Sequence, residues 1–73
     1  IEDYIKAENF LKRAVKLMPQ DPIVNDHYGD ILWKLDRKIQ ARYFWESVLD
    51  LDETKENMRK NINNKLVNGL KNS

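Results

Sequence analysis

Residues 5–17 read IKAENFLKRAVKL and residues 39–51 read IQARYFWESVLDL, and the second stretch repeats the pattern of the first after 34 positions. The identical residues at this spacing are Ile5 and Ile39, Ala7 and Ala41, Phe10 and Phe44, and Leu17 and Leu51. The similar residues are Leu11 and Trp45, Ala14 and Val48, and Val15 and Leu49. A period of about 34 residues is typical of helix–turn–helix units that stack on one another. The repeat therefore predicts an all-α fold.

The first stretch belongs to a predicted helix over residues 3–18. Its apolar residues recur every three or four positions, as on one helix face: Tyr4, Ala7, Leu11, Ala14, Val15 and Met18. Pro19 and Pro22 end this helix, while Asp21 is a suitable N-cap and Pro22 suits the first position of a second helix. The second helix carries its own apolar stripe: Val24, Tyr28, Ile31, Leu32 and Leu35.

The second stretch forms a predicted third helix, after a turn at residues 35–38 in which Asp36 tolerates the left-handed conformation. The polar residues 52–54 predict a break after this helix, with Asp52 or Thr54 as the next cap. A fourth helix is expected over residues 55–70, where the apolar residues form a narrow line: Met58, Ile62, Leu66 and Leu70. We expect it to fray after Asn68, because its many asparagines are poor helix formers.

The size and composition of the chain limit its class. Its 73 residues suffice for one small domain, and the 41% hydrophobic residues can supply a core. It has no cysteine, which excludes disulfides and thiolate metal sites. No apolar run reaches the roughly 20 residues of a membrane span, so no membrane contact is expected. Because Ile1 already lies inside a predicted helix, we expect a fragment of a longer protein, from its C-terminal end.

Charge is unevenly distributed along the chain, although the net charge is only +1. Residues 19–54 carry four basic and eight acidic side chains, whereas residues 55–73 carry five basic and one acidic. The acidic block could dock a basic ligand, or the basic block an acidic one. We favour the simpler interpretation, in which the two blocks neighbour each other in the fold.

These residues resemble the tetratricopeptide repeat (TPR) family over essentially the whole chain. The single domain, residues 1–73, would then hold the second helix of a partial repeat (1–19), a full repeat (20–53) and a C-terminal capping helix (54–73). The matching positions are Ala7, Leu11, Ala14, Pro19, Tyr28-Gly29, Leu32, Ala41, Trp45 and Val48. Glu53 departs from the closing proline of the family, and Val48 and Asn63 stand where small residues are usual. The resemblance implies a right-handed stack of about four antiparallel helices, a TPR-like α-solenoid.

Gly29 and Ala41 are central to this expectation. Neither has a bulky side chain, so two helices can approach closely where they meet. Leu11 and Trp45 would fill the wider space beside such contacts. The interpretation fails if Gly29 and Ala41 lie far apart, or if the segment after Thr54 continues the preceding helix.

The resemblance also implies a concave groove for a protein or peptide partner, lined by the first helix of each repeat. The implied positions are Ile23, Asp26, Asp30, Trp33, Lys34, Lys60 and Asn64, with Asn57, Val67 and Asn68 beside them. We take Trp33 as the anchor, because Leu32 already serves the apolar stripe of its helix and exposed tryptophans often dominate binding. The alternative is that Trp33 packs against a neighbouring repeat.

Other kinds of site have less support. Lys60 and Asn64 match two positions of the carboxylate clamp of some family members. Asp26 and Asp30 would repel a carboxylate there, so we expect Lys60 to pair with Asp26 instead of forming a clamp. Asp26, His27 and Asp30 lack a fourth ligand, and no metal is expected.

The sequence contains no glycine-rich phosphate loop, serine elbow or cysteine nucleophile, so neither an enzyme nor a cofactor is expected. Its C-terminal basic residues spread around their helix, which argues against nucleic acid. We therefore predict a protein–protein interaction module. The rival is a structural end cap of a longer repeat array with no ligand of its own, and its variant is a homo-oligomer formed through the exposed N-terminal repeat face.

Overall fold

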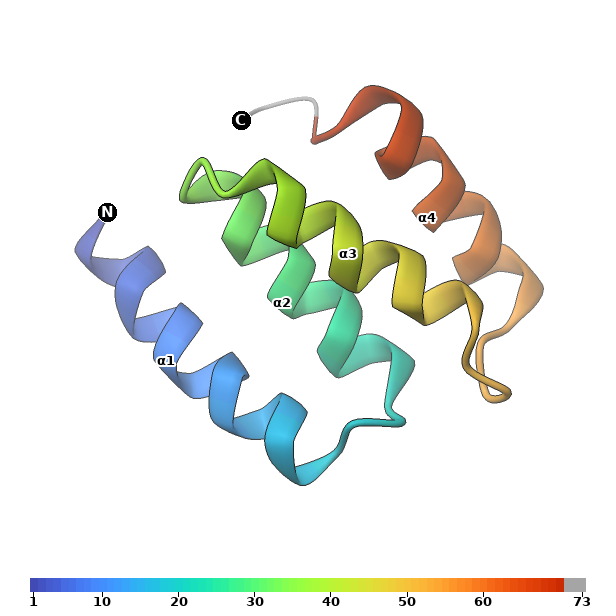
Figure 1. The fold of residues 1–73 in the computed structure, drawn as a ribbon, viewed down its shortest axis with the longest axis horizontal. Helices are drawn as coiled ribbons and strands as arrows, with labels where there is room; N and C mark the ends of the chain where they lie inside the picture. Colours follow the sequence, from blue (N-terminus) through green and yellow to red (C-terminus); the bar gives the residue numbers. More distant parts are fainter. Residues whose placement is uncertain (71–73) are drawn as a thin grey trace.

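The computed structural model describes residues 1–70, and all regular secondary structure in that range is helical. The helices are α1 (Glu2–Leu17), α2 (Pro22–Lys34), α3 (Lys38–Leu49) and α4 (Glu56–Asn68). Successive helices run antiparallel and each packs on its neighbour in the chain, so α1 and α4 lie on opposite flanks of the α2–α3 pair (Figure 1). The prediction of an all-α fold with about four helices is confirmed.

The turn between α1 and α2 is built as the sequence predicted. Asp21 is the N-cap of α2, and its carboxylate accepts hydrogen bonds from the backbone amides of Ile23 at 2.9 Å and Val24 at 3.2 Å. These bonds satisfy donors that a helix start otherwise leaves free, and Pro22 follows where its missing N–H has no cost. The buried side chain of Asn25 also donates to the carbonyl of Pro19 at 3.1 Å, which ties the turn to α2.

Asp36 ends α2 in the left-handed conformation, with φ of 63°, as predicted. The backbone amide of Asp36 donates to the carbonyl of Trp33 at 3.0 Å, and the amide of Arg37 donates to the carbonyl of Leu32 at 2.9 Å. This pair of reversed bonds is the Schellman arrangement, which usually has glycine at the position of Asp36. The chain therefore reverses within a few residues and starts α3 at Lys38.

The predicted cap of α4 is wrong. Lys55 holds the N-cap position, with no side-chain hydrogen bond, and neither Asp52 nor Thr54 caps the helix. The buried hydroxyl of Thr54 instead donates to the carbonyl of Val48 at 2.6 Å, and Arg59 donates to the carbonyl of Leu49 at 2.7 Å. These side chains thus bind the connection to carbonyls at the end of α3 rather than to the first amides of α4. The far end agrees with the sequence, because α4 ends at Asn68.

Helices α2 and α3 meet at Gly29 and Ala41. A Cβ atom placed on Gly29 would lie 2.5 Å from the Trp45 ring and 3.2 Å from the carbonyl oxygen of Ala41. Ala41 and Trp45 are both fully buried. The two helices approach closely here because Gly29 has no side chain.

The core consists of two clusters of buried side chains joined by Trp33. The first, Tyr28, Leu32 and Ala41, takes in Leu11 and Val15 of α1, while the second, Trp45, Val48 and Ile62, takes in Met58 and Leu66 of α4. Trp33 packs against both clusters and stacks on Trp45, with ring centroids 5.4 Å apart. The premise that the apolar stripe of α2 does not need Trp33 is therefore wrong, because this half-buried side chain packs against both core clusters.

Candidate interaction groove

Helix α4 is attached to α2 through one lysine and two aspartates. The Lys65 ammonium lies 2.8 Å from Asp26 Oδ1 and 2.9 Å from Asp30 Oδ1, and Trp45 Nε1 donates to the same Asp30 oxygen at 3.1 Å. The predicted pairing of Asp26 with Lys60 is wrong, and Lys60 is exposed. Ile62 is buried in the core, and Lys65 follows it by three residues and so shares its face of α4. Lys60 lies on another face of the helix.

The charges of this network perturb one another. Burial lowers the pKa of the Lys65 ammonium, but hydrogen bonds to Asp26 and Asp30 outweigh burial and raise it above 10.5. Burial raises the pKa of Asp26 above 3.8, against the lowering effect of Lys65. Both directions follow from two carboxylates sharing one ammonium in a partly buried place, which stabilises the cation more than either anion.

The network decides which of the expected groove residues remain open to a partner. Asp26 is buried and Asp30 half-buried, and both hold Lys65. Trp33 is half-buried in the core. Of the expected groove residues, the exposed ones are Ile23, Lys34, Lys60 and Asn64, together with Asn57, Val67 and Asn68 beside them.

Lys34 points to the other side of α2 from α4. Its ammonium lies 5.5 Å from the centre of the Tyr4 ring on α1. Such a contact between a cation and an aromatic face is attractive, though weak at an exposed position. Lys34 thus borders α1, and the sequence could not distinguish the two sides of α2.

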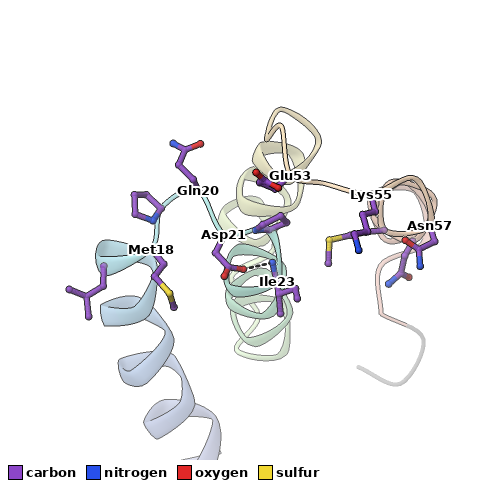
Figure 2. A pocket seen from close by; sticks show the side chains of 12 residues that line it. Met18, Gln20, Asp21, Ile23, Glu53, Lys55 and Asn57 are labelled. Atoms are coloured by element: carbon purple, nitrogen blue, oxygen red, sulfur yellow. Dashed lines mark hydrogen bonds between the residues drawn. The ribbon is translucent and has the colours of Figure 1, made fainter.

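An open pocket of about 870 Å³ lies at one end of the molecule, between the α1–α2 turn and the start of α4. Figure 2 shows Met18 on one side of it, Asp21 and Ile23 in the middle, and Lys55 and Asn57 on the other side. Its lining residues are Leu17, Met18, Pro19, Gln20, Asp21, Pro22, Ile23, Glu53, Lys55, Asn57, Met58 and Asn61. Leu17 is 82% exposed and Ile23 is 56% exposed, so the pocket presents apolar surface to solvent.

Sequence reasoning placed only Ile23 and Asn57 of these residues in the groove. It assigned Met18 to the packing face of α1 and named Leu17 only as a repeated position, the counterpart of Leu51. The available signal was the run of two apolar residues, Leu17 and Met18, just before Pro19, where a helix ends and such residues have few neighbours.

Four asparagines of α4 continue from this pocket along the helix. Asn57, Asn61, Asn64 and Asn68 are spaced by four, three and four residues and so share one stripe. The first two line the pocket, and Asn68 donates to the side chain of Asn64 at 2.6 Å. Asn61 and Asn68 lie one turn before and after Lys65, the residue that faces α2, so the stripe borders the α2 side of α4. Each exposed carboxamide can both donate and accept hydrogen bonds, as a peptide backbone does.

The suspected metal ligands are not assembled. His27 is exposed, while Asp26 and Asp30 bind Lys65. Within residues 1–70 no group of three or more histidines, cysteines or carboxylates is placed to hold a metal ion. None of the four helices in that range has the length and apolar character that crossing a bilayer requires.

No family model matches the chain, and no curated protein or solved structure is significantly similar to it. The features of this chain that bear on its function are therefore the pocket, the asparagine stripe and the helices that carry them.

Proposed function

We propose that this chain is a TPR-like protein–protein interaction module, with its helices in a right-handed repeat stack. Three observations support the proposal: the 34-residue repeat, the close approach of α2 and α3 at Gly29, and the separate helix α4 after Thr54. In such a stack, residues 1–19 are the second helix of a partial repeat, residues 20–53 a full repeat and residues 54–73 a cap.

The partner we propose is an extended peptide segment that carries an apolar side chain. The observation behind this proposal is the continuity of the apolar pocket with the asparagine stripe. One apolar side chain of the peptide enters between Leu17, Ile23 and Met58, and its burial supplies most of the affinity. Asn61 and Asn64 hydrogen-bond the peptide backbone and fix its direction.

The module acts by binding alone in this proposal and carries no catalytic group or cofactor. The second candidate function is a structural end cap, supported by the composition of α4. Apart from its apolar line and the exposed Val67, that helix is made of asparagine and charged residues, as expected for the last helix of a repeat stack where it meets water. The cap hypothesis leaves the pocket without a ligand.

Selection from a random peptide-display library distinguishes the two functions. We expect the selection to enrich peptides that share an apolar residue at one position. The Ile23→Glu change should lower the affinity of these peptides by about tenfold or more. Ile23 is exposed, and an acidic residue in the first turn of α2 is compatible with the helix dipole, so the variant should fold.

Ile39→Glu is the matched control, because Ile39 is 87% exposed in the first turn of α3 and does not line the pocket. Peptides that bind Ile23→Glu as well as the unmodified chain would exclude the pocket. A selection that enriches no peptide above an unrelated control protein would favour the end cap.

A further inference from the structure

The pocket is bordered by both methionines of the chain, one from each side. Met18 lies at the end of α1 and Met58 in the first turn of α4, and the sequence contains no other methionine. Figure 2 shows Met18 across the opening from Lys55 and Asn57. A methionine side chain is apolar and adaptable, so it suits a wall that receives apolar side chains of a ligand.

The two methionines differ in their exposure to solvent. Met18 is 47% exposed, whereas Met58 is half-buried and packs against the second core cluster. A reagent dissolved in water therefore reaches the Met18 thioether more readily than the Met58 thioether.

Thioethers are the groups of this chain that a peroxide attacks first, because the sequence has no cysteine. The sulfur attacks one peroxide oxygen, the O–O bond breaks and an S–O bond forms. The departing hydroxide takes the proton of the transferred oxygen and leaves as water. The thioether is thereby oxidised to a sulfoxide and the peroxide is reduced to water, so a flexible apolar side chain becomes a polar one.

The position of Met18 allows this change without disturbing the fold. Met18 is the C-cap of α1, where its backbone amide donates to the carbonyl of Ala14 at 2.8 Å. Its own carbonyl accepts from the amide of Asp21 at 3.2 Å. These backbone bonds do not involve the side chain, and an exposed sulfoxide stays in contact with water. A sulfoxide on Met58 would instead lie against the core, where an unpaired polar group is unfavourable.

We propose that Met18 is a site of reversible oxidation by peroxides, and that its sulfoxide lowers the affinity of the pocket for apolar side chains without unfolding the chain. The second half of this proposal rests on the proposed peptide function, because it concerns the same pocket. The sulfoxide places a polar group in a wall shared with Leu17 and Ile23, so a bound apolar side chain loses part of the surface that buries it. Methionine sulfoxide reductases return the sulfoxide to the thioether, which makes the change reversible.

Peroxide treatment followed by mass spectrometry of proteolytic fragments tests the site without any ligand. Met18 should gain an oxygen atom at least about five times faster than Met58. The melting temperature by circular dichroism should stay unchanged while Met58 is intact, and it should fall once Met58 is oxidised as well. Equal rates or a faster reaction at Met58 overturn the proposal, and so does a chain that unfolds when Met18 alone is oxidised.

Peptides selected on the unmodified chain test the effect on binding, and each variant is compared before and after treatment, with the peroxide removed. Met58→Leu leaves Met18 as the only methionine, and peroxide should lower the peptide affinity of this variant by about tenfold. A methionine sulfoxide reductase should restore that affinity. Met18→Leu is the matched control, since leucine is apolar and is not oxidised, and a short treatment should not change its affinity.

An oxidised Met58→Leu chain that binds the peptides as tightly as before treatment overturns the proposal. A chain that selects no peptide refutes the proposed function instead. The oxidation rates of the two methionines then still decide whether Met18 is the site, because they are measured without a peptide.

Discussion

Gly29→Ala tests the close contact on which the packing of α2 against α3 depends. The added methyl group would lie 2.5 Å from both Trp45 Cδ1 and Trp45 Nε1. Trp45 is fully buried, stacks on Trp33 and donates a hydrogen bond to Asp30, so its ring cannot move away without loss. The Ala41 carbonyl oxygen at 3.2 Å limits movement in the other direction. The helices must therefore separate, or the Trp45 ring must leave its position.

Two effects of opposite sign set the size of the change. Overpacking a core costs about 1–3 kcal/mol, and this geometry favours the upper end of that range. Alanine is about 1 kcal/mol better than glycine inside a helix, which offsets part of the cost. The net loss should be about 2 kcal/mol, which lowers the melting temperature by about 8–16 °C in a domain of this size. The total free energy of unfolding of a 73-residue domain is only about 4–11 kcal/mol, so this loss is a large part of it.

Urea denaturation followed by circular dichroism measures this loss as a lower midpoint at unchanged slope. Asn63→Ala on the exposed side of α4 is the control, since it improves helix propensity without adding a contact and should be neutral or slightly stabilising. Trp45→Leu should reduce the free energy of unfolding less in the Gly29→Ala protein than in the parent, because it also removes the clash between the new methyl group and the Trp45 ring. A Gly29→Ala protein as stable as the parent would refute the argument that this glycine sets the distance between the helices.

Three further predictions concern the network and the core. Lys65→Met leaves the Asp26 carboxylate buried without its cation, and should cost about 3 kcal/mol in urea denaturation; an unchanged midpoint would mean that α4 does not depend on the network. Burial raises the pKa of Asp26 in the folded protein above its ordinary value of 3.8, so the folded protein binds this proton more readily than the unfolded chain does. The folded state therefore gains stability as the pH falls from the pKa of folded Asp26 toward 3.8. The difference in free energy of unfolding between Asp26→Asn and the parent should therefore change with pH in that range and become constant at neutral pH. An Asp26 carboxyl group that titrates below 3.8 by NMR would contradict this prediction. Trp33→Ala should cost about 2–4 kcal/mol, because the ring joins both clusters, whereas Lys34→Ala should stay within about 0.5 kcal/mol; equal effects would place Trp33 outside the core.

The turns could be predicted from the sequence because each depends on residues that are close in the chain. Asp21 and Pro22 start α2, and Asp36 reverses the chain after it, through bonds that span only two to five residues. Thr54 was misassigned because its hydroxyl can bond either of two helix ends, and only the packed structure selects the carbonyl of Val48.

The contact between α2 and α3 was also predictable, although it joins distant segments. Gly29 and Ala41 are small residues on two predicted helices that follow one another in the chain, and helices can approach closely where such residues meet. The all-α fold, its four helices and this contact are therefore properties of the sequence alone.

The candidate site was predicted only in part, because it depends on how each helix is rotated and where its ends lie. Lys60 and Lys65 have the same charge on the same helix, and the packing of Ile62 against Trp45 and Val48 decides which one reaches Asp26. The pocket combines the α1–α2 turn with the start of α4, more than thirty residues further along the chain. Helix rotation and the meeting of distant ends follow from the sum of many side-chain contacts across three helices. No single sequence motif contains this information, so only the tertiary structure determined the rotation of the helices and the position of the pocket.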